Sequence, residues 1–268
     1  MRRILLALSM FAASIGAAGG AGYDALNVGI QYANDQAWDN ALIWLDKAIS
    51  AGDLLPDQVR AAHYNKAIAF ARSGRPTEAI PEYTAALELT PDDVQLLVDR
   101  ALAHLAAGQS ERAVADLRIA HDKKPKNARI NLALGLVNLV LDRPKDASAA
   151  FSDALDANKS RYAWLWLKIS DLKQKKETPA YSGPYRSDRW PSVVVNMYAG
   201  KAEESEVLRE VKDYGESENC EALFYIAEWR LLHNDPDGGK SLLQKTASDC
   251  SSDDMEPLMA KTELGKLP

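Results

Sequence analysis

The chain has 268 residues and a mass of 29.4 kDa, enough for one large domain or two small ones with a buried core. Hydrophobic residues make up 47% and charged residues 26%, a globular composition that excludes a disordered or collagen-like chain. The formal net charge of −6 argues against nucleic acid and anionic lipid as the main partners, because both favour a basic surface.

The first residues have the order of an export signal. Arg2 and Arg3 form a short basic region, an uncharged apolar stretch covers residues 4–15, and small residues fill 16–22. The apolar stretch is too short for a comfortable membrane span, and it contains no cysteine for lipid attachment. The alternatives are an uncleaved anchor and a buried N-terminal helix.

The rule that small residues flank a signal cleavage site is met equally by cleavage after Ala18 and after Ala21. We take residues 1–21 as the signal peptide. We therefore expect an exported protein, periplasmic in a Gram-negative envelope, with no transmembrane segment in its mature chain.

A period of 34 residues organises the next part of the chain. The residues that recur in phase are Ala67, Ala101 and Gly135; Ala79, Ala113 and Ala147; Tyr83, Leu117 and Phe151; and Pro91 and Pro125. This pattern resembles the tetratricopeptide repeat (TPR), a helical hairpin in which small residues let two helices approach closely. The resemblance implies an all-α fold, in which such hairpins stack into a superhelix.

Four repeats fit residues 22–161, the first separated from the second by an insertion at 50–57. Residues 162–219 form a helical and aromatic linker, with short helices expected at about 192–199 and 203–214. A fifth, weaker TPR-like hairpin and a capping helix occupy residues 220–268. This fifth copy is either a diverged repeat or merely a helical hairpin.

The linker narrows the resemblance from TPR proteins in general to one group of them. It contains a tryptophan-rich helix that begins at Arg161, an aromatic loop that ends in Trp190-Pro191, and the segment from Met197 to Lys201. Together with the segment from Cys220 to Trp229, these features look like the NlpI-type periplasmic TPR lipoproteins. That resemblance implies an adaptor that docks a periplasmic protease and presents murein hydrolases to it. Members of that group carry a lipidated cysteine, and this chain has none near its start.

We find no pattern that supports catalysis, a metal or a cofactor. The four histidines are scattered, and two cysteines 30 residues apart do not form a zinc site. Ser170 and Lys173 match the Ser-x-x-Lys spacing of serine acyltransferases, but the companion motifs are absent. We expect a protein that is not an enzyme.

The two cysteines have a structural use. Cys220 lies near the start of the first helix of the last hairpin and Cys250 at the end of the second, so antiparallel packing brings them to the same end. In an oxidising compartment they should form a disulfide. Two free buried thiols are the alternative.

The inner wall of the repeats is the candidate binding surface. In TPR proteins, positions 5 and 9 of the first helices line this wall, and here they are apolar. They are Leu26, Ile30, Tyr64, Ile68, Val98, Leu102, Leu132 and Leu136. Three occupants are open: the chain's own later helices, a partner peptide, or a second copy of the chain.

A second docking surface is expected on the aromatic loop, through Tyr181, Tyr185 and Trp190, because tyrosine and tryptophan concentrate binding energy. The sequence thus favours a non-catalytic adaptor of the cell envelope with protein partners. The rival interpretations are a generic scaffold for an envelope or secretion complex and an unrecognised enzyme on a helical solenoid.

Overall fold

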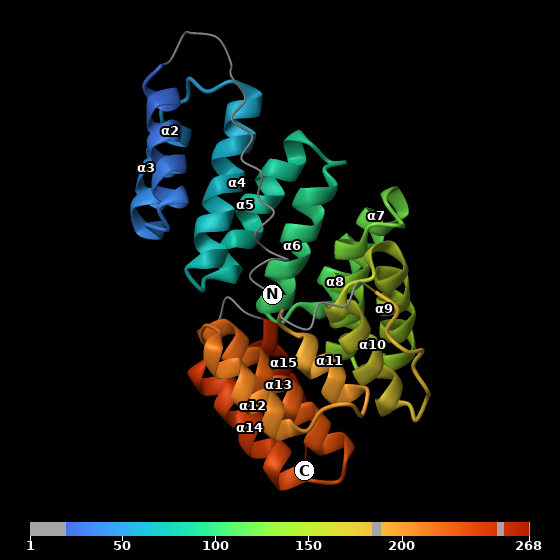
Figure 1. The fold of residues 1–268 in the computed structure, drawn as a ribbon. Coiled ribbons are helices and arrows are strands. Elements are labelled where there is room, and N and C mark those ends of the chain that lie inside the picture. Colours follow the sequence, from blue (N-terminus) through green and yellow to red (C-terminus); the bar gives the residue numbers. More distant parts are fainter. Residues whose placement is uncertain (1–19, 184–188, 251–254, 268) are drawn as a thin grey trace. The chain divides into compact units, whose positions relative to one another are not determined.

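The computed structural model describes residues 20–183, 189–250 and 255–267 (Figure 1). In this part of the chain the regular structure is entirely helical, which confirms the expected all-α class. The expected signal peptide falls almost wholly outside the described residues. None of the described helices is both long and apolar enough to cross a bilayer.

The chain divides into two compact units, which we call the N unit (described residues 20–124) and the C unit (described residues 125–267). The N unit contains three helical hairpins. They are α2 (Ala21–Asn34) with α3 (Trp38–Ser50), α4 (Pro56–Arg72) with α5 (Pro76–Leu89), and α6 (Val94–Ala106) with α7 (Ser110–Lys123).

The C unit begins with the hairpin of the fourth repeat and continues through the linker to the last hairpin. Its elements are α8 (Ala128–Val140), α9 (Pro144–Asn158), α10 (Arg161–Lys173), α11 (Ser192–Tyr198), α12 (Glu204–Glu210), the 3₁₀ helix η1 (Val211–Asp213), α13 (Glu216–Leu232), α14 (Pro236–Asp249) and α15 (Met255–Leu264).

Turn chemistry explains where the hairpins bend. Each turn inside a hairpin contains one residue with positive φ, a conformation that glycine adopts without strain. These residues are Gln36, Gly74, Gly108, Asp142 and Asn234. Proline in the first turn then starts α5, α9 and α14, where its missing N–H costs nothing.

Small residues sit where the two helices of a hairpin cross. Ala41, Ala79, Ala113 and Ala147 are fully buried, as the repeat pattern requires. In the last hairpin Gly239 takes this role, because a Cβ there would lie 2.7 Å from the side chain of Leu231. The fifth copy is therefore a closely packed helical hairpin.

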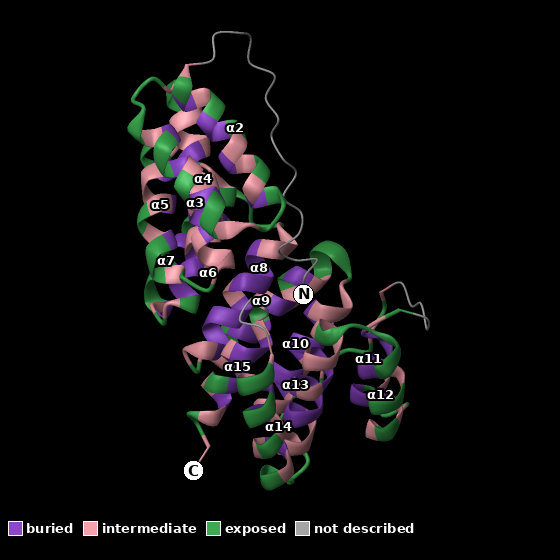
Figure 2. Ribbon diagram, turned by 90° about the vertical axis from the view of Figure 1, so that its left-hand side faces the viewer, coloured by how far each residue is buried: buried purple, intermediate pink, exposed green. Residues whose placement is uncertain are grey.

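The C unit has an aromatic core. The ring of Trp166 lies 6.1 Å from Phe151, 5.4 Å from Phe224 and 5.9 Å from Tyr225, measured between centroids. Residues of α8, α9, α10, α11, α13, α14 and α15 join this cluster (Figure 2). The fourth hairpin therefore packs with the helices that follow it, and the division between the units falls inside the repeat segment expected at 22–161.

Candidate protein-binding surface

An apolar row remains partly accessible in the N unit. Ile30 on α2, Ile68 on α4 and Leu102 on α6 occupy position 9 of three successive first helices, and all three are half-buried. Side chains at an ordinary core position of this fold are fully buried, as Leu45 and Leu117 are. The row at position 9 thus combines apolar chemistry with access to solvent.

Position 5 behaves differently. Leu26 and Val98 are only 3% and 2% exposed, so their side chains belong to the core of the N unit. Tyr64 is half-buried. Its hydroxyl donates a hydrogen bond to Asp99 Oδ2 at 3.1 Å, and its ring lies 6.2 Å from that of Tyr83. Of the predicted residues at this position in the N unit, only Tyr64 reaches the surface.

In the fourth repeat the expected open wall is closed. Leu132 and Leu136 on α8 are 6% and 3% exposed and belong to the same core as Phe151 and Trp166. The expectation that they line an accessible groove is corrected. Leu132 is buried as Leu26 and Val98 are at the same position of the N unit, and Leu136 belongs to a core that includes residues of the later helices. For this repeat, the chain's own helices are the occupant.

The aromatic loop is fastened to its own unit. The Tyr181 hydroxyl donates to the Lys159 carbonyl oxygen at 2.7 Å, and the indole N–H of Trp164 donates to the Pro179 carbonyl oxygen at 2.8 Å. Both Tyr181 and Trp190 are half-buried, and Tyr185 lies outside the described residues. Binding of a partner by this loop stays a prediction.

A buried carboxylate holds the end of the loop. Glu221 is 1% exposed, and its Oε2 accepts hydrogen bonds from the indole N–H of Trp190 at 2.6 Å and the hydroxyl of Tyr162 at 2.9 Å. Burial and the neighbouring Glu221 carboxylate raise the pKa of Tyr162, so its hydroxyl stays protonated and donates. Glu221 and Glu228 stand seven residues apart in an otherwise apolar segment. This pattern is the sequence signal that could have indicated two buried carboxylates with polar partners.

The Ser-x-x-Lys match is structural. Lys173 Nζ lies 3.0 Å from Glu228 Oε2 and 2.6 Å from Glu263 Oε2, which joins α10 to α13 and α15. Burial would lower the pKa of Lys173, but the two carboxylates outweigh burial and raise it. The Ser170 hydroxyl donates to the Pro144 carbonyl oxygen. A lysine held as an ammonium ion cannot serve as a general base.

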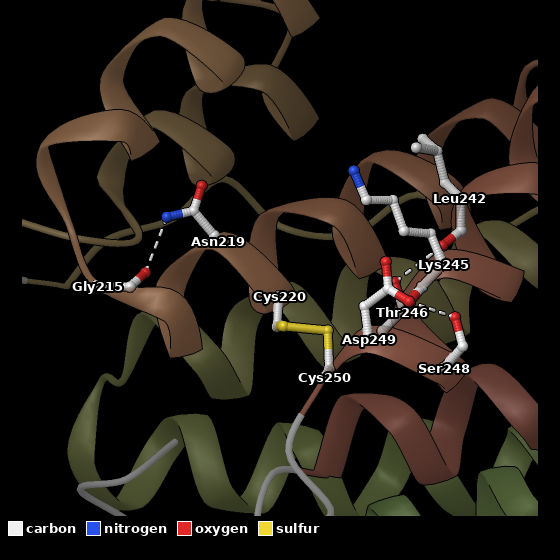
Figure 3. Close-up of a disulfide and its surroundings, with 9 residues drawn as sticks. All are labelled: Gly215, Asn219, Cys220, Leu242, Lys245, Thr246, Ser248, Asp249 and Cys250. Carbon is white, nitrogen blue, oxygen red and sulfur yellow. Dashed lines mark hydrogen bonds between the residues drawn. A yellow bond between two sulfur atoms is a disulfide. The ribbon is translucent and has the colours of Figure 1, made fainter.

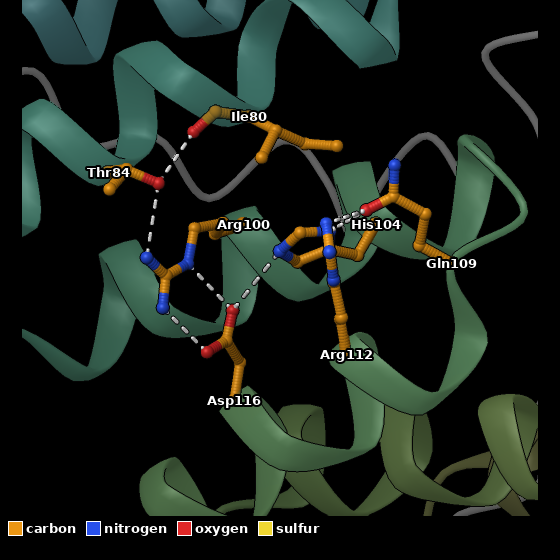
Figure 4. A network of polar contacts seen from close by, with 7 residues as sticks. All are labelled: Ile80, Thr84, Arg100, His104, Gln109, Arg112 and Asp116. Atoms are coloured by element: carbon orange, nitrogen blue, oxygen red, sulfur yellow. Dashed lines mark hydrogen bonds and ion pairs between the residues drawn. The ribbon is translucent and has the colours of Figure 1, made fainter.

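A polar network connects three helices of the N unit (Figure 4). Arg100 on α6 donates two hydrogen bonds to Asp116 on α7, at 2.8 and 2.7 Å, and one to the Thr84 hydroxyl on α5 at 3.1 Å. His104 Nε2 lies 4.0 Å from Asp116, and its Nδ1 lies 2.9 Å from Gln109 Oε1. These contacts join members of the network to one another, so the network acts as a clamp between helices.

The predicted disulfide is present. Cys220 in the second turn of α13 and Cys250 just beyond α14 are bonded, with their Cα atoms 5.8 Å apart (Figure 3). The bond closes the open end of the last hairpin, as antiparallel packing requires. Among the described residues, histidines, cysteines and carboxylates form no group that could hold a metal ion.

Comparison with known proteins identifies the repeats. The tetratricopeptide repeat family matches residues 60–93 and 98–163 in two separate segments. The chain therefore contains tetratricopeptide repeats, which generally serve as protein-interaction scaffolds. The further resemblance to NlpI-type proteins remains an inference from the linker.

Solved structures share the fold. A tetratricopeptide repeat protein from Parabacteroides merdae ATCC 43184 is 17% identical, with a TM-score of 0.60 over 93% of this chain and 100% of that one. MamA (41-end) from Desulfovibrio magneticus RS-1 is 17% identical, with a TM-score of 0.55 over 72% and 98%. Pseudomonas aeruginosa pilF is 20% identical, with a TM-score of 0.53 over 91% and 97%. At these identities the likeness concerns the fold alone.

Proposed function

We propose that this protein is a non-catalytic adaptor, exported to the periplasm, that holds other proteins through the first helices of its N unit. Its partners are proteins, and the candidates implied by the linker's resemblance are a periplasmic protease and the murein hydrolases presented to it. A second copy of the chain is a further candidate occupant.

The apolar row at position 9 is the observation that carries this proposal. Ile30, Ile68 and Leu102 stand at the same place in three successive hairpins and keep part of their surface in contact with solvent. A partner that places apolar side chains at regular intervals, such as a helix or an extended peptide, could bury this row. Tyr64, four residues before Ile68 on α4, adds a half-buried aromatic ring whose hydroxyl donates a hydrogen bond to Asp99.

Two observations support export. The N-terminal sequence has the order of a signal peptide, and the bonded cysteines suit an oxidising compartment, where disulfides persist.

The contacts of two polar clusters support a non-catalytic role. The clusters around His104 and around Lys173 are the ones that a catalytic hypothesis would use, and their contacts join helices of the fold instead.

A charge placed in the row tests the proposal. We expect Leu102→Glu to abolish capture of the envelope partner, because burying an unpaired carboxylate in an apolar contact is costly. Ile43→Glu is the matched control, since Ile43 on α3 is 63% exposed and lies outside the row. The measurements are co-purification from the envelope fraction and circular dichroism of each variant.

Two results would contradict the proposal. Normal capture by a folded Leu102→Glu variant would exclude the row as the binding surface. Unfolding of this variant would show that Leu102 is a core residue, as Leu132 and Leu136 are. The identity of captured proteins separates the finer proposal from its rival: murein hydrolases and a protease favour the NlpI-like role, and other proteins favour a generic envelope scaffold.

A further inference from the structure

The N-terminus of α2 has an unusual cap. Its N-cap residue is Gly20, which has no side chain, and the capping group comes instead from Asp53 in the loop between α3 and α4. The Gly22 backbone N–H donates to Asp53, with Oδ1 at 3.1 Å and Oδ2 at 3.4 Å. Both carboxylate oxygens therefore surround one backbone nitrogen from 31 residues away.

Two glycines, Gly20 and Gly22, make the close approach of the Asp53 carboxylate possible. A Cβ on residue 22 would lie 2.1 Å from Asp53 Oδ1, and a Cβ on residue 20 would lie 2.1 Å from Oδ2. Both distances are far inside van der Waals contact. Any other residue at position 22 would displace the carboxylate.

The same nitrogen is the one that cleavage after Ala21 would convert into an α-amino group. We infer that, in the exported chain, Asp53 is the docking site for the α-ammonium group of Gly22, formed when the signal peptide is removed at the Ala21–Gly22 bond. This inference rests on the proposed export. In the hydrolysis, water adds to the Ala21 carbonyl carbon, the C–N bond breaks, and the Gly22 nitrogen leaves with a proton.

The charges around the Gly22 nitrogen decide whether the pair between the α-ammonium group and Asp53 is favourable. The positive end of the α2 dipole opposes an ammonium group at its N-terminus. The Asp53 carboxylate and the carbonyl-bearing end of the antiparallel α3 both favour it, and the Ala48 carbonyl oxygen lies 3.1 Å from the place of a Cβ on Gly22. An ammonium group also offers three donors where the amide offered one.

The first measurement is the intact mass of the exported full-length protein. We expect a mature chain that begins at Gly22. A chain that begins at Gly19 would overturn this inference while leaving export intact. A chain that retains Met1 would overturn the inference and the proposed export together.

The second measurement is the reactivity of the α-amino group toward acetylation at pH 7, followed by the mass of the N-terminal peptide. Pairing holds the amine protonated, so Asp53→Asn should accelerate acetylation about threefold to tenfold, which corresponds to a pKa change of about 0.5 to 1 unit. Asparagine can still accept the hydrogen bond, so this variant should keep its fold.

Asp57→Asn is the matched control, because it removes the same charge a few residues further along, at the start of α4. It should leave the acetylation rate unchanged. Equal rates in the wild type and in the folded Asp53→Asn variant would show that Asp53 does not hold the α-ammonium group, and would overturn the inference even for a chain that begins at Gly22.

Discussion

In the fourth repeat, the glycine at position 8 of the first helix lies against the aromatic ring at position 24 of the second helix. Gly135 faces Phe151, and a Cβ on Gly135 would lie 2.3 Å from Phe151 Cε1. The equivalent residues of the third repeat are Ala101 and the smaller Leu117, whereas the second repeat has Ala67 and Tyr83. Close-packed interiors feel a change of one methyl group, so the contact between Gly135 and Phe151 leaves no room for a larger residue at position 135.

The close contact between Gly135 and Phe151 predicts the effect of one methyl group. Gly135→Ala should lower the free energy of unfolding by about 1–3 kcal/mol, because the added carbon overlaps a fully buried ring. Gly135→Ala combined with Phe151→Leu reproduces the pair found at Ala101 and Leu117 and should recover part of the loss. Urea denaturation of both variants measures this, and an unchanged midpoint for the single variant would refute the close packing of position 135 against Phe151.

At the scale of the elements, sequence reasoning succeeds where the determinants are local. Gly74 and Pro76, two residues apart, indicate a hairpin turn without any knowledge of the rest of the chain. Sequence reasoning fails where the contacts of a residue come from distant segments of the chain. Leu136 stands at the same repeat position as Ile68 and Leu102, but it is buried in a core that includes residues of helices beginning after residue 160. The capping of Gly22 by Asp53 is likewise invisible to a local pattern.

The clamp between α5, α6 and α7 predicts a dependence of stability on pH. Burial lowers the pKa of His104 below 6.5, despite the hydrogen bond to Gln109 and the charge of Asp116. The unfolded chain therefore binds this proton more tightly than the folded chain does. Stability from His104 is complete above about pH 6.5 and is lost as the pH falls through the lower, folded-state pKa.

His104→Gln removes this titration. Between pH 7.5 and pH 5.5, the urea midpoint of the wild type should fall more than that of His104→Gln. His121→Gln is the control, because His121 lies on α7 near its end and takes no part in the clamp. Parallel curves for the wild type and His104→Gln would show that this histidine does not limit stability in acid.

At the scale of the whole molecule, the two units share one repeat pattern but differ in how far its position 9 is buried. In the C unit, position 9 of the first helix of the fourth repeat is core, completed by the aromatic cluster around Trp166. In the N unit, the same position of three hairpins stays half-buried. We therefore propose that partner binding belongs to the N unit. The C unit has its own hydrophobic core, to which α15 contributes, and the disulfide joins the two helices of its last hairpin.

Site-specific photo-crosslinking in the exported, full-length protein tests this assignment most directly. A photoreactive phenylalanine derivative replaces Ile68 or Leu102 in the row, and Ile43 on α3 serves as the exposed control position. We predict discrete crosslinked adducts to a protein partner, or to a second copy of the chain, from positions 68 and 102 and not from position 43. Adducts from position 43 alone, or equal adducts from all three positions, would contradict the claim that the protein binds its partners through this row.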